Sequence, residues 1–188
     1  MTRWQPNACG RLEQAAMELY GERGFEQTTV AEIAERAGLT ERTFFRYFAD
    51  KREVLFSGSE ELRRMLTDAV ADAPASTAPI DAVAAAFEAV GALFEQRREG
   101  ARARARIIAA NADLQERELI KLAAFAAAIA EELRRRGVGE PAASLTAEVG
   151  IAAFKITFER WVDDPDQPDF AELFRASLDE LRAVASGS

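Results

Sequence analysis

Two arginines share one face of a short segment near the amino-terminal end of the chain. Projected as a helix at about 100° per residue, Arg42 and Arg46 fall on the same side, and Thr43 and Phe45 flank them. Arginine binds the edge of guanine through two hydrogen bonds, and an apolar group can contact the methyl group of thymine in the major groove. This face therefore has the chemistry to read base pairs.

The other side of the same segment is aromatic. Phe44, Tyr47 and Phe48 project together, and we expect all three to face inward and close a small core. A less specific interpretation stays open, since most short amphipathic helices with two arginines are solvated surface helices. In that case the ring of Phe45 merely covers neighbouring core.

The residues before this segment predict the elements that position it. Thr29-x-x-Glu32 is a capping box that starts one short helix, and Gly38 suits the left-handed position that ends it. Ala34 is small enough to let a second helix cross closely, and Thr40 caps that second helix. Two capped helices joined by a tight turn predict a helix-turn-helix, with the arginine face on its second helix.

The charge of the chain is unevenly distributed. The net charge is −8, from 24 basic and 32 acidic side chains, which argues against a coat for nucleic acid. Residues 1–65, however, hold 10 basic and 11 acidic groups, a net of −1, and the stretch from Arg42 to Arg52 has four basic groups and one acid. Lys51 and Arg52 open the next predicted helix, where a phosphate is favoured. A local basic face is therefore predicted on an acidic protein.

Several classes of enzyme are excluded by missing residue types. The chain has no histidine, so it holds no Ser-His-Asp triad and no HExxH site. Its single cysteine, Cys9, builds neither an intrachain disulfide nor a cysteine-ligated zinc site. No phosphate loop of the GxxxxGK[ST] type occurs, and no pair of carboxylates stands out. We expect a protein that is not an enzyme, with no cofactor and no metal.

The whole chain is predicted to be helical. Apolar residues make up 48% of it and recur with a period of 3.6, whereas no stretch alternates with a period of two. Glycine, proline and aspartate divide the chain into about nine helices. We expect an all-α fold, with a helix-turn-helix DNA-binding domain over residues 1–50 and a helical bundle for ligand binding and dimerisation over residues 51–188. The longest strictly apolar run, from Leu122 to Ala130, is less than half as long as a membrane span, and the amino terminus lacks the apolar core of a signal peptide, so a cytoplasmic protein is expected.

The last two predicted helices, over 140–162 and 168–185, carry more apolar surface than one protomer needs. The first has apolar stripes on two opposed faces, which places it between its own domain and a partner, although burial of both stripes within one chain stays open. A homodimer would hold two reading helices about 34 Å apart, as a near-palindromic operator requires. The predicted interface residues are Leu145, Val149, Ala152, Ile156, Phe174 and Leu181.

Aromatic residues of the body are candidates for an apolar ligand pocket. The candidates are Phe87, Phe94, Phe125, Phe154 and Phe158, although aromatic residues at helical spacing are more often ordinary core. Arginines are also dense over residues 97–106. These could meet an anionic ligand such as an acyl thioester of coenzyme A, but a solvated run of charges is favoured.

Residues 10–56 resemble the amino-terminal domain of the TetR family of bacterial transcriptional regulators. The matching motifs are Gly24-Phe25, Thr28-Thr-Val, Ile33-Ala34, Ala37-Gly38, Thr43, Tyr47-Phe48 and Lys51. The resemblance implies an all-helical homodimer whose three amino-terminal helices bind a double-stranded DNA operator. It also implies a larger carboxyl-terminal domain that binds a small-molecule effector and then releases the DNA, as a repressor does.

The resemblance also implies roles for single residues. Thr29 and Lys51 resemble contacts to phosphate, and Tyr47 resembles a further contact to the DNA backbone. Arg42, Thr43 and Phe45 resemble groove contacts. Two of these residues depart from the family's pattern, since the family often has glycine at the position of Arg42 and tyrosine at that of Phe45.

An alternative function is that of a helical adaptor, which uses its head as a protein-docking surface. This alternative predicts little DNA affinity.

Overall fold

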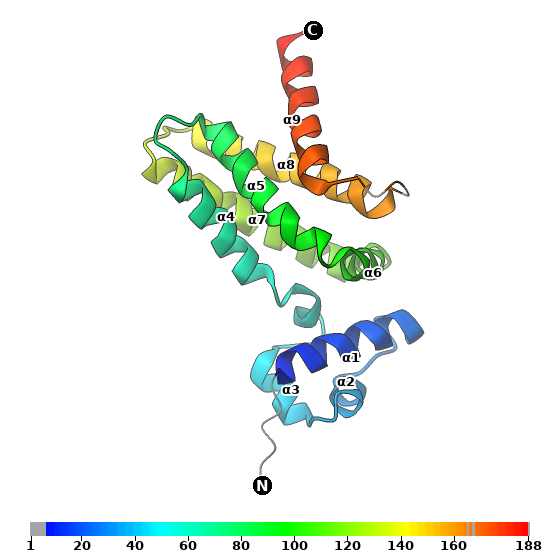
Figure 1. Cartoon of the computed structure of the whole chain (residues 1–188). Helices are drawn as coiled ribbons and strands as arrows, with labels where there is room; N and C mark the ends of the chain where they lie inside the picture. Colours follow the sequence, from blue (N-terminus) through cyan, green and yellow to red (C-terminus); the bar gives the residue numbers. More distant parts are fainter. Residues whose placement is uncertain (1–6, 165, 167, 188) are drawn as a thin grey trace. The chain divides into compact units, whose positions relative to one another are not determined.

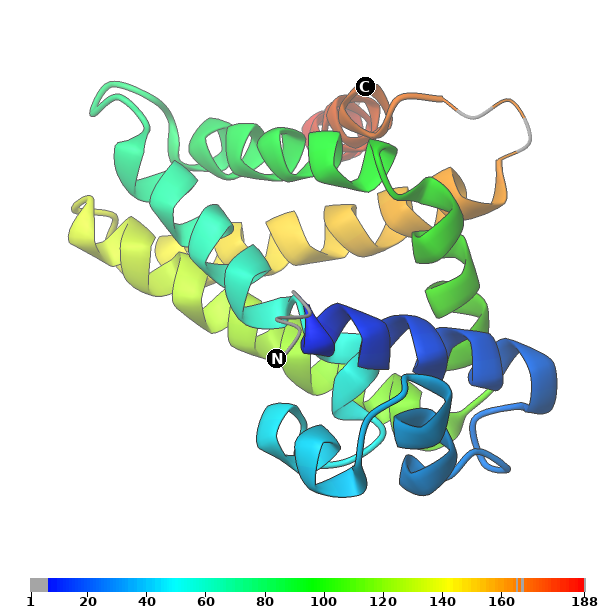
Figure 2. The same ribbon diagram turned by 60° about the horizontal axis from the view of Figure 1, so that its bottom comes forward.

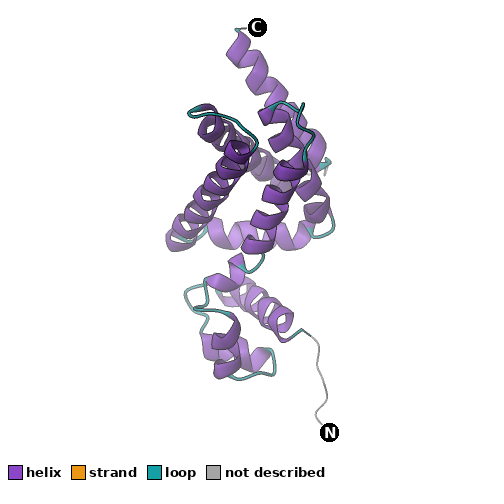
Figure 3. Ribbon diagram, turned by 90° about the vertical axis from the view of Figure 1, so that its left-hand side faces the viewer, coloured by secondary structure: helices purple, strands orange, loops and turns teal. Residues whose placement is uncertain are grey.

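The computed structural model describes residues 7–164, 166 and 168–187. These residues form nine α-helices and one 3₁₀-helix, with no strand among them (Figure 3). The predicted all-α fold and the number of helices are therefore confirmed. Over the same described ranges, none of the helices combines the length and the apolar character that a membrane crossing requires.

The chain divides into two compact units. One comprises Met1–Gly58 and Ala103–Glu118, and the other comprises Ser59–Arg102 and Leu119–Ser188. The predicted division between residues 50 and 51 is not tested by this grouping and stays a prediction.

The first unit contains three α-helices and a 3₁₀-helix from the amino-terminal part of the chain, together with residues 103–118 (Figure 1). These helices are α1 (Ala8–Arg23), α2 (Val30–Arg36), α3 (Glu41–Tyr47) and η1 (Glu53–Phe56). Helix α1 packs against α2, α3 and η1. Leu12, Ile33 and Phe44 are fully buried between these helices, and their burial fixes the angle at which α3 leaves the turn.

The second unit is a helical bundle. Its helices are α4 (Ser59–Asp72), α5 (Pro79–Glu95), α8 (Ala142–Asp163) and α9 (Phe170–Ser186), together with parts of α6 (Arg98–Ala109) and α7 (Ala112–Arg135). Helix α5 packs against α4, α8 and α9 (Figure 2). Close approach of α5 to α8 depends on Gly150, because a Cβ atom there would lie 2.5 Å from Cγ1 of Val83.

Candidate functional site

The helix-turn-helix has the caps that its sequence predicts. The Oγ1 atom of Thr29 accepts a hydrogen bond from the Glu32 N–H at 3.3 Å, and the Glu32 carboxylate accepts one from the Thr29 N–H at 2.9 Å. The Thr29 N–H is the main cause that lowers the pKa of Glu32 below its usual value, followed by the Thr29 hydroxyl, which donates to the same carboxylate at 2.9 Å. The predicted capping box is confirmed, and it fixes where α2 begins.

The turn after α2 is closed by backbone hydrogen bonds. Gly38 has a φ of +64° and donates to the carbonyl of Glu35, while the Leu39 N–H donates to the carbonyl of Ala34 at 2.8 Å. This is a Schellman motif, which requires the left-handed conformation at Gly38. Thr40 then accepts from the N–H of Thr43 at 3.2 Å and caps α3. The predicted roles of Gly38 and Thr40 are confirmed.

The outer face of α3 carries the two arginines and the exposed aromatic ring. Arg42 and Arg46 are exposed, and Thr43 is half-buried. The Phe45 side chain is 55% exposed, although its ring packs edge-on against the fully buried Phe44 with centroids 5.5 Å apart. The predicted arrangement of the two faces is confirmed for these residues.

Tyr47 does not face inward, so that part of the sequence prediction is wrong. Its side chain is 43% exposed, and its hydroxyl accepts a hydrogen bond from Nη2 of Arg46 at 3.2 Å. The Arg46 guanidinium also lies 4.9 Å from the centre of the Tyr47 ring. Helix α3 ends at Tyr47, and the chain continues through Phe48 in an extended conformation. Phe48 therefore fills the core position, and Tyr47 is left beside the arginine face.

Lys51 holds the loop between α1 and α2. Its ammonium donates to the backbone carbonyls of Phe25, Glu26 and Thr28 at 2.8, 3.3 and 3.0 Å. It also lies 4.4 Å from the centre of the Phe25 ring. Because a lysine has three N–H donors, all of them are occupied in the free protein. A positioning role is visible for Lys51, while its contact with phosphate stays a prediction.

Acidic partners separate the arginines of the first unit into two groups. Arg23 pairs with Glu32 at 2.7 Å, and Arg36 pairs with two carboxylates of α1. Arg42 and Arg46 have no ion pair within the described residues, and their charges are therefore available to an external anion. The arginine face of α3 and the exposed ring of Phe45 are hereafter called the reading face.

Four of the five candidate pocket residues belong to one aromatic cluster in the second unit. The rings of Phe87, Phe94, Phe154 and Phe158 pack against one another, with centroids 5.2–6.0 Å apart. The cluster is completed by Trp161, Phe170 and Phe174. Phe125 is buried on α7. These contacts show how the rings pack, and a ligand pocket among them stays a prediction.

A carboxylate that the sequence analysis did not single out organises this cluster. Glu95 accepts hydrogen bonds from Nε1 of Trp161 at 2.7 Å, from the N–H of Phe170 at 2.9 Å and from Arg98 at 2.9 Å. Burial acts to raise the pKa of Glu95, but these hydrogen bonds, that of Arg98 foremost, outweigh it and lower the pKa. No spacing rule identifies Glu95, because its partners lie 66 and 75 residues away along the chain.

The dense arginines after Glu95 are largely engaged, so the favoured interpretation as a solvated run is wrong for three of them. Arg98 donates to the carbonyls of Trp161 and Pro168. Arg102 donates to the carbonyl of Val162 at 2.5 Å. In the first unit, Arg104 donates to the carbonyl of Leu55 at 2.7 Å and to Glu118. Each of these arginines satisfies carbonyls that would otherwise lack donors.

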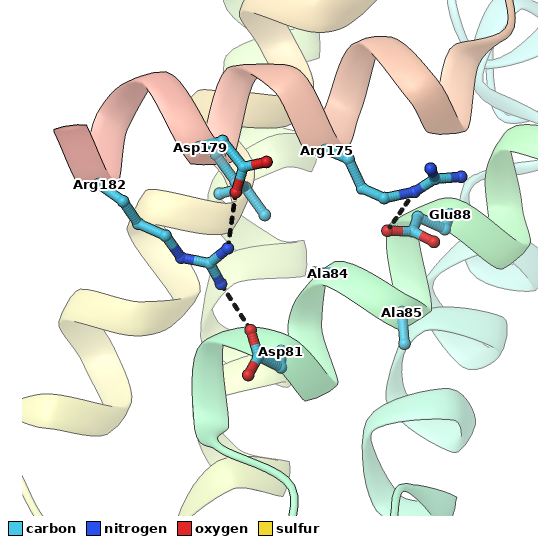
Figure 4. A pocket seen from close by; sticks show the side chains of 8 residues that line it. Asp81, Ala84, Ala85, Glu88, Arg175, Asp179 and Arg182 are labelled. Carbon is cyan, nitrogen blue, oxygen red and sulfur yellow. Dashed lines mark hydrogen bonds and ion pairs between the residues drawn. The ribbon is translucent and has the colours of Figure 1, made fainter.

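Ion pairs bridge a surface groove of about 320 Å³ between α5 and α9 (Figure 4). Arg182 bonds to Asp81 at 2.5 Å and to Asp179 at 2.9 Å, and Arg175 bonds to Glu88 at 3.1 Å. Each of these charges has a partner, so the ion pairs fix α9 on α5, although three carboxylates face two guanidiniums and leave one negative charge in excess.

Apolar side chains that are exposed or half-buried in the protomer follow α8 and continue on α9. Leu145 is 61% exposed and Ile156 is 54% exposed, and Leu181 is also exposed. Val149 is half-buried and Ala152 is exposed. Phe174, which the sequence placed on this surface, is fully buried against the rings of Phe87 and Phe170. It has no surface to offer a partner and is removed from the set.

Comparison with known proteins yields two family models that together cover most of the chain. The model described as "Bacterial regulatory proteins, tetR family" matches residues 13–57, and the model described as "MftR C-terminal domain" matches residues 77–186.

Individual relatives agree with these matches. The chain is 39% identical over 80 residues to the HTH-type transcriptional regulator TcmR of Streptomyces glaucescens, a match over 43% of this chain and 35% of that protein. It is 25% identical over 175 residues to the putative mycofactocin biosynthesis transcriptional regulator MftR of Mycobacterium tuberculosis, which covers 92% and 88% of the two chains. The crystal structure of Thermus thermophilus FadR in complex with lauroyl-CoA matches with a TM-score of 0.56 and 26% identity, over 95% and 94% of the chains.

Proposed function

The chain belongs to the TetR family of bacterial transcriptional regulators, and on that premise we propose that it is a repressor released from its operator by a small-molecule effector. The observation that carries this proposal is the reading face. Two exposed arginines that have no acidic partner among the described residues stand on the second helix of a fully capped helix-turn-helix. That is the arrangement in which side chains of the second helix reach base edges in the major groove.

Different residues of the first unit take different parts in DNA binding. Arg42 and Arg46 read bases, and Phe45 and Thr43 contact the groove beside them. Thr29, Thr40, Tyr47 and Lys51 contribute near the phosphate backbone. Their placement supports this division, because Tyr47 is exposed beside Arg46 and both threonines start helices. Phosphate contacts set the register of the protein on DNA, whereas base contacts set its sequence preference.

The test of this function is a binding titration with a duplex selected from random sequences by the purified protein. Arg42→Ala and Arg46→Ala are each expected to weaken binding by about 1–3 kcal/mol and to relax sequence preference. Affinity of the unmodified protein is expected to fall steeply with salt. A helical adaptor would instead show weak binding without that steep dependence. If neither substitution changes the titration, the reading face is wrongly assigned.

A homodimer supplies the second reading face. The proposed interface is formed by the exposed side chains of Leu145, Ala152 and Ile156 and the half-buried Val149 on α8, together with Leu181 on α9. An isologous contact between two copies would bury this apolar surface and pair two reading faces on a near-palindromic operator. Ile156→Glu is expected to give monomers in sedimentation at micromolar concentration. Arg64→Glu, at an exposed position of α4 outside the proposed interface, is the control and is expected to leave the dimer intact.

A largely apolar effector fits the second unit. The aromatic cluster around Phe94 and Phe158 offers apolar surface, and both side chains are half-buried rather than fully enclosed. Among relatives, T. thermophilus FadR is described in complex with lauroyl-CoA, which contains a long apolar chain. Binding would favour a conformation in which the two reading faces no longer fit the operator. If an apolar ligand abolishes operator binding by the unmodified protein but leaves operator binding by Phe158→Ala intact, this assignment is supported.

A further inference from the structure

Among the described residues, Arg11 is the arginine with a buried side-chain nitrogen that has no hydrogen-bond partner. Arg11 lies on α1, is half-buried, and makes no ion pair or side-chain hydrogen bond with any described residue. Its Nε atom is buried and unsatisfied. A buried donor without an acceptor costs free energy, so its presence in a folded protein calls for a reason.

The position of Arg11 supplies a reason. Its Nη1 atom lies 4.0 Å from where a Cβ atom on Gly38 would stand, so the guanidinium rests on the turn between α2 and α3. Gly38 precedes Thr40, the cap of α3, by two residues. Consecutive Cα atoms are about 3.8 Å apart, and the guanidinium is therefore close to the end at which α3 begins.

The arginines around Arg11 are held differently. Arg36 bonds to Glu18 and Glu22, and Arg23 bonds to Glu32. Either of them would have to break an ion pair to reach an external anion. Arg11 is held by packing alone, so it can turn outward without losing a hydrogen bond. Like Arg42 and Arg46, it carries a positive charge that the protein does not neutralise.

We propose that Arg11 is a phosphate-binding residue, which contacts the DNA strand that borders the groove occupied by α3. The inference rests on the proposed function, since it requires the reading face to enter DNA. A major groove is about 12 Å wide and is lined by phosphates on both sides. A cation beside the turn that leads into the reading helix meets that border. Guanidinium binds phosphate through paired N–H donors, which satisfies the Nε atom of Arg11 in the complex.

The experiment measures the affinity of the full chain for its selected operator and for random duplex DNA over a range of salt concentrations. In Arg11→Met, both affinities are expected to fall by the same factor. The slope of log affinity against log salt should drop by about 0.9 for each phosphate that Arg11 no longer neutralises, or about 1.8 for a dimer. Arg11→Lys, which keeps the charge, is expected to retain the slope. Arg135→Met, an exposed arginine of α7, is the control for net charge.

The outcomes separate a phosphate contact from a brace for the turn. If Arg11 only supports Gly38, Arg11→Met lowers the melting temperature and the affinity but leaves the salt slope unchanged, and this would overturn the proposal. Arg11→Gln gives the same readout if the methionine variant folds poorly. If the unmodified protein binds DNA with a steep slope that no Arg11 variant alters, this inference fails and the proposed function stands. If the unmodified protein shows no salt-dependent DNA binding, the proposed function itself fails.

Discussion

The Glu95 carboxylate accepts a hydrogen bond from the indole N–H of Trp161 at 2.7 Å, across the joint between α5 and α8. The same carboxylate receives the N–H of Phe170, at the start of α9, and the guanidinium of Arg98. Arg98 in turn lies 4.3 Å from the centre of the Trp161 ring. One acidic group therefore joins three helices around the aromatic cluster, which makes its charge a stability determinant.

Replacing Glu95 by glutamine is expected to destabilise the protein. The variant keeps one oxygen acceptor but loses the negative charge that strengthens the bonds from Trp161 and Arg98. Hydrogen bonds to charged groups contribute more than neutral ones, so a loss of about 1–2 kcal/mol in the free energy of unfolding is expected. Urea denaturation measures it. Glu99→Gln, an exposed carboxylate on α6, is the control, and an equal loss there would refute the special role of Glu95.

The contribution of Glu95 is expected to disappear in acid. Its pKa is lowered in the folded protein from the usual 4.5, so the folded state binds this proton less readily than the unfolded state. The stability that Glu95 provides is therefore fully present above pH 4.5 and is lost as the pH falls through the lower folded-state pKa. The difference in unfolding free energy between the unmodified protein and Glu95→Gln should shrink below pH 4.5. A constant difference down to the acid transition would contradict this.

Local chemistry in the sequence was sufficient to predict the helix-turn-helix. Caps and turns depend on residues within a few positions of each other, and Thr29, Gly38 and Thr40 do in the structure what their types predict. Tyr47 projects about 60° from the buried Phe44, but it is the last residue of α3, and its hydroxyl and ring pair with Arg46 instead of entering the core. For such a short helix, the point at which it ends decides which ring enters the core.

Long-range contacts in the second unit could not be predicted in this way. The arginines at 98 and 102 looked solvated because their partners are carbonyls 60 to 70 residues further along the chain. Phe174 shares a stripe with exposed residues in projection, but the rings of Phe87 and Phe170 cover it. Periodicity indicates which residues share a face, and only packing shows what covers that face.

Gly150 is expected to resist replacement by alanine. A Cβ atom there would lie 2.5 Å from Cγ1 of Val83 and 3.3 Å from the Phe87 ring, so α5 and α8 would have to separate. Overpacking of this kind costs about 1–3 kcal/mol, which exceeds the gain of up to about 1 kcal/mol that alanine brings to a helix. Gly150→Ala should therefore lower the melting temperature.

Two controls accompany this variant. Gly21→Ala in α1 has nothing within 4 Å of the added methyl group and is expected to be neutral or stabilising. Val83→Ala added to Gly150→Ala removes the clashing methyl group and should recover part of the loss. If Gly150→Ala is as stable as Gly21→Ala, the close approach of α5 and α8 is not what makes glycine necessary.

Replacing Lys51 by methionine is expected to loosen the first unit before any DNA is present. Methionine retains the apolar stem but leaves the carbonyls of Phe25, Glu26 and Thr28 without their shared donor. Because the bonds to Phe25 and Thr28 are partly buried, a loss of about 1–3 kcal/mol in the free energy of unfolding is expected, measured by urea denaturation of the free protein. Lys155→Met, an exposed lysine of α8, is the control and should change little. If Lys51→Met is as stable as the unmodified protein but binds DNA more weakly at every sequence, Lys51 acts on phosphate rather than on the loop between α1 and α2.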